Sequence, residues 1–253
     1  MKKTLILKIG SSTLTANSNR ISRGKIEDIA RQINALSRDY HIAIVSSGAI
    51  ATAKHFIEVN KWSTSQSKQA LAAIGQPILM QIYNEIFRDF AIATAQCLVT
   101  YRDFEYEEAQ NNILNTLNDL FANGFVPIIN ENDTIAIDEL VFGDNDKLSA
   151  YVANLLQADL LVLASDIDGV FDKNPQKHKN AQHISLIKDI DSCQKYVDEN
   201  DENKLGTGGM TSKIQAAEIC SRNKTEMWIV NGGNNNFLLD CLAGKQIFTQ
   251  FKF

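Results

Sequence analysis

Short apolar runs alternate with helical periodicity along almost the whole chain. Six runs are rich in aliphatic and β-branched residues, which favour strands: Thr4–Ile9, His41–Ser46, Thr94–Val99, Phe125–Ile129, Leu160–Ala164 and Glu226–Val230. Five segments repeat apolar residues every three or four positions, which is typical of amphipathic helices: Gly24–Ser37, Pro77–Phe90, Glu107–Ala122, Lys147–Leu156 and Thr211–Ser221. The alternation predicts an α/β fold, with an open, mostly parallel sheet sandwiched between helices.

Local breaks in this pattern place the turns. Gly10-Ser11-Ser12 and Ser46-Ser47-Gly48 each follow a predicted strand, so we expect strand-to-helix turns there. Gly75-Gln76-Pro77 divides a long helical region into two predicted helices, with Pro77 in the first turn of the second. The run Leu160–Ala164 is apolar at every position, as expected for a strand that is buried on both faces.

Composition narrows the class of protein. The chain has 253 residues, of which 44% are hydrophobic and 22% are charged, as in an ordinary globular protein. It contains no repeat and no linker that would divide it, so we expect a single domain over residues 1–253. The net charge of −5 and the scattered basic residues argue against a nucleic-acid-binding surface.

The sequence shows no signal for export, membrane insertion or metal binding. The apolar run near the N-terminus is broken by Lys8, which makes it too short for a signal peptide. No stretch approaches the ~20 apolar residues of a membrane span. The four cysteines lack the spacing of a metal site, and no histidine stands where a ligand is expected. We therefore expect a cytoplasmic protein with reduced cysteines and no metal-ligating residues of its own.

Two acid-amide clusters carry the strongest functional signal. Asn130-Glu131-Asn132-Asp133 ends a predicted strand, and Gly143-Asp144-Asn145-Asp146 comes directly before a predicted helix. Open α/β sheets bind ligands at such ends, and these side chains can hold an ammonium group or orient lysines around phosphate. The alternative is that they only form turns and helix caps. The segment between them, Thr134–Phe142, alternates weakly and could form a small hairpin flap.

A glycine-rich segment, Gly206-Thr207-Gly208-Gly209-Met210-Thr211-Ser212-Lys213, opens the last predicted helix. Glycines let the backbone approach a ligand closely, and the N–H groups at a helix N-terminus favour phosphate. Lys213 adds a positive charge beside those donors. The spacing matches neither the P-loop nor the Rossmann glycine motif. The alternative is a flexible turn in which Thr211 is an ordinary N-cap.

Three further positions at strand ends have candidate roles. Lys8 lies inside an apolar strand, which is costly unless the ammonium group is paired or functional; the alternative is an edge-strand lysine that reaches solvent. Ser47 could offer a hydroxyl to an anion, and Ser165-Asp166 could contact a nucleotide or only form a turn. No nucleophile stands beside an evident base. Glycine turns, lysines and acid-amide clusters together favour phosphoryl transfer, which depends on positioning and charge stabilisation.

These motifs are those of a known family. The chain resembles the amino acid kinase superfamily and, within it, the glutamate 5-kinases. The matching segments span essentially the whole chain: Lys8–Ser12, Ser46–Ile50, Lys68–Pro77, Pro127–Asp133, Gly143–Asp146 and Thr207–Met210. The lysine and the general fold are shared across the superfamily, whereas the Asn-Glu-Asn-Asp and Gly-Asp-Asn-Asp pair is specific to glutamate 5-kinases.

The resemblance implies a reaction of ATP with L-glutamate that gives L-glutamyl 5-phosphate and ADP, the first step of proline synthesis. It implies three residues that neutralise and organise the transferring phosphoryl group: Lys8, Lys213 and Asp146. It implies three glutamate-binding residues: Ser47, Asp133 and Asn145. It implies an ATP site, with Mg²⁺ held mainly by the phosphates, that is formed by Lys8, Ser165, Asp166, Thr207, Gly208, Gly209, Met210, Thr211, Ser212 and Lys213.

The resemblance also implies inhibition by proline, a homo-oligomer and functional coupling to glutamyl phosphate reductase. Three departures from the family pattern stand out. Many relatives carry a C-terminal PUA domain, which we do not expect in this chain, ending at Phe253. Ser165 stands where Thr is common, and Thr211-Ser212 reverses a common Ser-Thr order. Both changes keep the hydroxyl groups.

Two other functions remain open from the residues alone. The first is a kinase of the same fold that acts on acetylglutamate, aspartate, carbamate or UMP. A substrate with a free α-ammonium group needs an acid to meet it, which Asp133 supplies and acetylglutamate would not require. The second is a non-catalytic amino-acid sensor. The presence of Lys8, Asp146 and Lys213 together argues against a sensor, which has no need of groups for phosphoryl transfer.

Overall fold

The computed structural model describes residues 2–16, 18, 20–56, 65–136, 145–175, 177–190, 193 and 209–253. Within them, eight strands form one sheet in the order β3-β4-β2-β1-β5-β9-β10-β8. Their bounds are Ala93–Val99 (β3), Phe125–Glu131 (β4), Tyr40–Ser46 (β2), Lys3–Ile9 (β1), Leu160–Ser165 (β5), Glu226–Asn231 (β9), Thr249–Phe251 (β10) and Leu186–Ile187 (β8). Every neighbouring pair is parallel except β9 and β10, which are antiparallel. The predicted mostly parallel sheet is confirmed.

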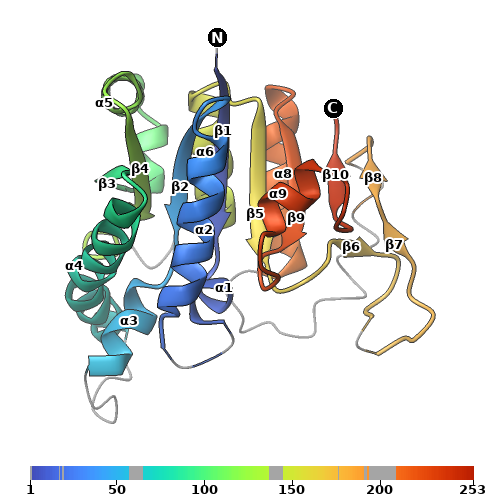
Figure 1. Cartoon of the computed structure of the whole chain (residues 1–253). Coiled ribbons are helices and arrows are strands. Elements are labelled where there is room, and N and C mark those ends of the chain that lie inside the picture. Colours follow the sequence, from blue (N-terminus) through green and yellow to red (C-terminus); the bar gives the residue numbers. More distant parts are fainter. Residues whose placement is uncertain are drawn as a thin grey trace.

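Helices cover both faces of this sheet (Figure 1). Their bounds are Ser11–Thr15 (α1), Arg23–Leu36 (α2), Ala49–Phe56 (α3), Ser65–Asp89 (α4), Glu107–Ala122 (α5), Asn145–Leu155 (α6), Met210–Arg222 (α8) and Phe237–Leu242 (α9). A 3₁₀ helix spans Tyr101–Phe104, and a separate hairpin pairs β6 (Val170–Phe171) with β7 (His183–Ile184). No helix among the described residues is long and apolar enough to cross a membrane.

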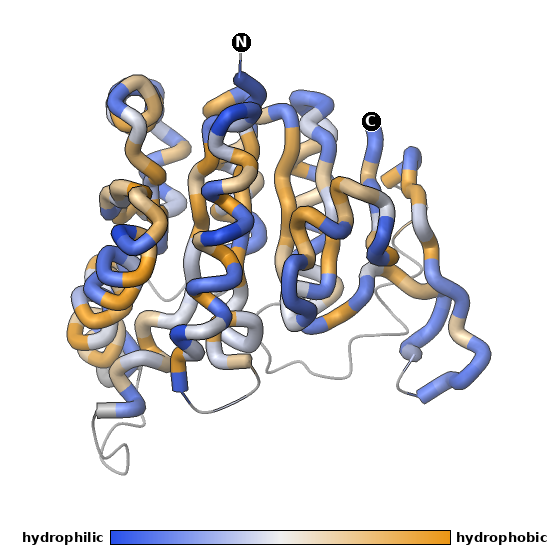
Figure 2. Tube along the Cα trace, viewed as in Figure 1, coloured by the Kyte–Doolittle hydropathy of each residue, from blue (hydrophilic) through white to orange (hydrophobic). Residues whose placement is uncertain are grey.

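Alternate residues of the central strand β1 enter two separate cores. Leu5 and Leu7 pack on the face covered by α2, α4 and α9, whereas Ile6 packs on the face covered by α5, α6 and α8. This is the two-residue period of a strand, and Figure 2 shows the apolar residues gathered on the strands and on the helix sides that face them. Lys8 has the same parity as Ile6, so its side chain lies on the face of α6 and α8.

The predicted break of the long helical region is wrong. Helix α4 continues from Ser65 to Asp89 with Pro77 inside it. Proline removes one backbone donor from a helix, which costs stability. Beyond Pro77, α4 buries Leu79, Tyr83 and Phe87 completely in the core, and this burial of apolar surface outweighs the lost hydrogen bond.

Gly75 also has a tertiary role in α4. A Cβ atom at this position would lie 1.8 Å from the carbonyl oxygen of Ala49. Only glycine allows the backbone of α4 to approach the start of α3 this closely. The turn before α3 contains Gly48, whose φ of +104° also favours glycine. The two glycines therefore bring α4 against the end of β2.

Candidate active site

Among the described residues, the most buried charge is that of Asp146, in the first turn of α6, with 0% of its surface exposed. One carboxylate oxygen, Oδ1, forms an ion pair with the ammonium group of Lys8 from β1. The other, Oδ2, accepts hydrogen bonds from Lys213 Nζ and Ser212 Oγ of α8, both at 3.1 Å. Three elements that are distant in sequence thus place two lysines on one carboxylate.

Burial and charge act in opposite directions on Asp146. Burial alone would raise the pKa of its carboxyl group, but the ammonium groups of Lys8 and Lys213 lower this pKa to about 2. Removal of a lone carboxylate from water is very costly, so the two cations are what keep Asp146 ionised. The group is therefore a fixed anion at neutral pH. It is suited to holding the lysines in place and not to accepting a proton.

The position of Lys8 follows from the sheet. Strand β1 is central, with parallel partners β2 and β5 on its two sides. The alternative of an edge-strand lysine that reaches solvent is therefore wrong, and Lys8 is only 6% exposed. After β1 the chain turns at Gly10, whose N–H donates to the carbonyl of Ala164 at the end of β5. The two strand ends meet at the site, as the parallel arrangement requires.

A second group of polar side chains lies next to Asp146. Asn145 Nδ2 donates to the carbonyl of Ser46 at 3.0 Å, to Ser47 Oγ at 3.1 Å and to Asn130 Oδ1 at 2.9 Å. Asn130 Nδ2 in turn donates to Gln76 Oε1 at 2.9 Å. The structure thus joins the end of β2, the end of β4, α4 and α6 by hydrogen bonds between uncharged groups. Asn145 is engaged in tertiary contacts and is more than a helix cap.

Of the acids of the first cluster, Glu131 is the last residue of β4 and Asp133 lies in the turn that follows. Glu131 is buried, and this burial raises the pKa of its carboxyl group to about 7. The charge of Asp133 raises this pKa further, whereas the charge of Lys147 lowers it. Burial also raises the pKa of the half-buried Asp133. Asn132 has a turn role, since it accepts a hydrogen bond from Thr134 at 2.7 Å. Most of the predicted flap, residues 137–142, lies outside the described residues.

The predicted nucleotide residues lie at the ends of β5 and α8. Ser165 Oγ donates to the carboxylate of Asp166 at 3.1 Å. Gly209 is the N-cap of α8, and Met210, Thr211 and Ser212 form the first turn. Thr211 is thus inside the helix, and its reading as the N-cap is wrong. Thr207 and Gly208 lie outside the described residues, as do Gly143 and Asp144 of the second cluster.

A cavity of about 290 Å³ lies beside Asp166. It is lined by Ser12, Thr13, Ala16, Asp166, Asn231, Gly233 and Asn234. The turn after β9 is tied directly to the end of β5, because Gly232 N–H donates to the carbonyl of Ser165 at 2.8 Å and Asn231 Nδ2 donates to Asp168 at 2.9 Å. The cavity therefore opens next to the predicted nucleotide residues.

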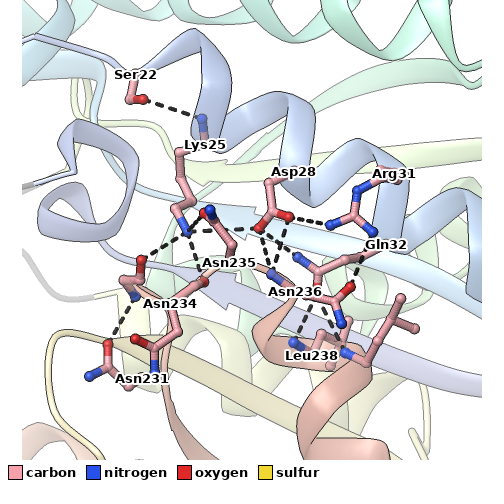
Figure 3. Close-up of polar contacts among 12 residues, drawn as sticks. Ser22, Lys25, Asp28, Arg31, Gln32, Asn231, Asn234, Asn235, Asn236 and Leu238 are labelled. Carbon is pink, nitrogen blue, oxygen red and sulfur yellow. Dashed lines mark hydrogen bonds and ion pairs between the residues drawn. The ribbon is translucent and has the colours of Figure 1, made fainter.

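One side of helix α2 holds the turn after β9, and sequence reasoning missed it (Figure 3). The buried Lys25 donates to the carbonyls of Gly233 and Asn234 at 3.1 and 2.9 Å. The carboxylate of Asp28 accepts from the N–H of Asn236 at 3.1 Å, and Gln32 Oε1 accepts from the N–H of Leu238 at 2.8 Å. The spacing of 25, 28 and 32 on one helix face was the available signal. It was hidden because polar residues are ordinary on helix surfaces.

Of the predicted site residues, the structure brings together two sets. Lys8, Asp146 and Lys213 form the charged centre, and Ser47 and Asn145 are hydrogen-bonded to each other. The sets are joined through the chain, because Asn145 and Asp146 are neighbours. Asp133 stands at the end of β4, three residues beyond Asn130. Asn130 and Gln76 are the site residues that the sequence prediction did not single out individually.

Comparisons with known proteins agree with this architecture. The model of the amino acid kinase family matches residues 3–231. The chain is 41% identical over 241 residues to Glutamate 5-kinase of Helicobacter hepaticus, in an alignment that covers 95% of this chain and 90% of the relative. It is 40% identical over 249 residues to Glutamate 5-kinase of Thermoanaerobacter sp. (strain X514), covering 98% and 67% respectively. UMP kinase from Ureaplasma parvum shares the fold at 19% identity, with a TM-score of 0.68 over 100% of both chains.

Proposed function

Because this chain belongs to the amino acid kinase family, we propose that it transfers the γ-phosphoryl group of ATP to the γ-carboxylate of L-glutamate. The products are L-glutamyl 5-phosphate and ADP, as in the first step of proline synthesis. One observation carries the proposal: the buried carboxylate of Asp146 holds the ammonium groups of Lys8 and Lys213 at one point. Paired cations of this kind suit a reaction in which negative charge moves between phosphate oxygens.

The two lysines act on the transferring phosphoryl group. They come from different elements, β1 and α8, and pair with different oxygens of the Asp146 carboxylate, so both can contact the same group. Asp146 is a positioning residue, because its charge fixes both ammonium groups before the substrate arrives. Such preorganised charges avoid rearrangement during the reaction, and each contributes on the order of 3 kcal/mol to catalysis. Glutamate needs no general base, since its γ-carboxylate is already ionised at neutral pH.

Glutamate binds at the hydrogen-bonded side chains of Ser47, Asn130 and Asn145, next to the charged centre. Ser47 and Asn145 present a hydroxyl and an amide at this position, and Asp133 meets the α-ammonium group. The adjacency of Asn145 and Asp146 in α6 supports this arrangement, since it sets the amino-acid site directly beside the phosphoryl site. A free α-ammonium group is the feature of glutamate and aspartate that acetylglutamate, carbamate and UMP lack.

The residues present also fit ATP with Mg²⁺. Helix α8 has 13 residues and begins at Met210, after the N-cap Gly209, so its first N–H groups and Lys213 offer donors and positive charge to phosphates. Ser165 and Asp166, beside the cavity after β5, complete the nucleotide site with Thr207 and Gly208. Among the described residues no group of three or more acids, histidines or cysteines could hold a metal ion by itself. We expect Mg²⁺ to be held mainly by the phosphates, whose charge it would neutralise when bound.

Further properties follow from the same proposal. Proline inhibits the enzyme by occupying a site that overlaps with that of glutamate, since both carry an α-carboxylate beside a charged amine. The enzyme acts in the cytoplasm, where ATP is available, and forms a homo-oligomer. Glutamyl phosphate reductase consumes the labile acyl phosphate.

Release of ADP, coupled to a spectroscopic assay, tests the function directly. The acceptors are L-glutamate, N-acetylglutamate, aspartate, carbamate and UMP, each with ATP and Mg²⁺. We expect turnover with L-glutamate and at least tenfold lower kcat/KM with every other acceptor. A higher kcat/KM with another acceptor would show that this acceptor is the substrate. No ADP release with any of the five acceptors would favour a non-catalytic sensor.

A further inference from the structure

Gln76 has a buried hydrogen-bond donor that lacks a partner. The residue lies in α4 and is only 8% exposed. Its Oε1 accepts a hydrogen bond from Asn130 Nδ2 at 2.9 Å, whereas its Nε2 has no hydrogen-bond partner among the described residues. A buried amide donor left without an acceptor destabilises the folded protein. Such a donor calls for an acceptor that the described part of the polypeptide does not provide there.

The orientation of this amide is determined by its neighbours. Asn130 Oδ1 accepts from the backbone N–H of Glu131 at 2.9 Å and from Asn145 Nδ2 at 2.9 Å. A backbone N–H can only donate, so the oxygen of Asn130 must face Glu131 and its NH₂ group must face Gln76. The oxygen of Gln76 must then face Asn130. Exchange of the oxygen and nitrogen positions would break this chain of hydrogen bonds, so the NH₂ group of Gln76 points away from Asn130.

Two neighbours on α4 locate the side chain relative to the amino-acid site. Gln69, seven residues earlier on the same face of the helix, donates to the carbonyl of Ala136 at 3.3 Å. That face of α4 therefore contacts the segment that follows β4, and this segment contains Asp133. Gly75 sets the helix backbone against Ala49, directly after the Ser47 turn. Gln76 thus lies between the two segments to which we assign glutamate binding.

We propose that Gln76 is a substrate-binding residue whose Nε2 donates a hydrogen bond to the α-carboxylate of the amino-acid substrate. The inference rests on the proposed function. The γ-carboxylate must lie at Lys8 and Lys213, next to Asp146. Gln76 is separated from Asn145 by Asn130, on the side away from that centre. The far end of the substrate, with its α-carboxylate and α-ammonium groups, is what reaches Gln76 and Asp133.

The alternative role for Gln76 is purely structural, as an acceptor that fixes Asn130. Two substitutions separate the roles. Gln76→Glu keeps an oxygen for Asn130 but replaces the donor by a second oxygen, and Gln76→Met removes both groups at similar volume. Gln81→Met is the matched control, because Gln81 lies on an exposed part of the same helix and donates to Glu85 at 2.8 Å.

The measurements are steady-state KM values for glutamate and ATP at pH 6 to 9, with the melting temperature of each variant. We expect Gln76→Met to raise the KM for glutamate at least tenfold and that for ATP by less than threefold, because a hydrogen bond to a charged group contributes about 1.5–3 kcal/mol. In Gln76→Glu the KM for glutamate should rise with pH relative to wild type, since only the protonated carboxyl can donate. Gln81→Met should match wild type.

Three outcomes overturn the inference. The first is a normal glutamate KM in Gln76→Glu at every pH, which would leave Gln76 a support for Asn130. The second is an equal rise of both KM values. The third is a normal glutamate KM in folded Gln76→Met. Calorimetric titration of wild type with glutamate distinguishes these from failure of the proposed function: a wild-type enzyme that neither binds nor phosphorylates glutamate refutes the function itself, and the inference with it.

Discussion

Lys213 Nζ donates a hydrogen bond to Asp146 Oδ2 at 3.1 Å across a separation of 67 residues. The other oxygen of the same carboxylate pairs with Lys8. This anion pairs with both lysines, each of which is almost fully buried. Two ammonium groups therefore share one carboxylate at this centre. Phosphoryl transfer needs this kind of preorganised positive charge.

Removal of either lysine should affect turnover more than glutamate binding. We expect Lys8→Ala and Lys213→Ala each to lower kcat about 10²-fold, because one preorganised charge contributes on the order of 3 kcal/mol. Lys→Arg at either position should rescue poorly, since a planar guanidinium cannot replace a compact ammonium group. Lys245→Ala, at an exposed position, is the control. Steady-state kinetics checks this, and near-normal turnover in either alanine variant would refute its role.

Asp133→Asn should have the opposite kinetic signature. An amide cannot neutralise an α-ammonium group, so the KM for glutamate should rise about tenfold or more while the KM for ATP stays within twofold. Asp119→Asn, at an exposed position of α5, controls for loss of a carboxylate elsewhere. Both constants are measured in one set of assays. Equal losses for glutamate and ATP would place Asp133 at the phosphates or the metal instead.

Proline should compete with glutamate. Because both ligands present an α-carboxylate beside a charged amine, we expect proline to raise the apparent KM for glutamate and leave kcat unchanged at saturation. Asp133→Asn should weaken both ligands together. Assays at several concentrations of each ligand check this. Inhibition that no concentration of glutamate relieves would argue against an overlapping site.

Glu131 should make stability fall as pH rises. Burial and the charge of Asp133 raise its pKa from 4.5 to about 7 in the folded protein. The folded state therefore binds this proton more tightly than the unfolded state, and the free energy of unfolding decreases between about pH 4.5 and 7. Glu131→Gln should remove this part of the dependence, so its melting temperature should gain on wild type across that range. Melting temperatures are measured for both proteins at pH 5, 6, 7 and 8. A constant difference between the two proteins at all four pH values would argue against the raised pKa of Glu131.

Gly75→Ala should destabilise the protein. The added methyl group would lie 1.8 Å from the carbonyl oxygen of Ala49, so α4 and α3 would have to separate. We expect a loss of more than about 2 kcal/mol, in the range of strained core substitutions. Gly24→Ala in α2 is the control, because nothing lies within 4 Å of its added Cβ atom. That variant should be neutral or up to about 1 kcal/mol more stable. Similar unfolding free energies in the two variants would contradict the close approach of α4.

The sequence by itself determined the class of fold and the chemistry of the strand ends. The two-residue and 3.6-residue periods of apolar residues reflect local burial, so the six long strands and the helices α2, α5, α6 and α8 were predictable within a few residues, whereas the start of α4 was not. The helix Glu107–Ala122 was predicted with its observed bounds. Lys8 was identifiable because a charged side chain inside an apolar strand requires a partner. Asn145 and Asp146 were identifiable because they belong to an acid-amide cluster at the start of a predicted helix.

Only the tertiary structure decided which partners those residues have. The continuous helix through Pro77 is the clearest example, because local preference predicted a break and burial of Leu79 and Tyr83 overrode it. The unpaired donor of Gln76 was equally invisible, since it depends on Asn130, 54 residues away. The sequence also gave no sign that Lys25 binds the carbonyl of Gly233, because the two residues lie far apart in the chain. A sequence period reports which side of an element is buried, whereas hydrogen bonds depend on the three-dimensional approach of groups that lie far apart in the chain.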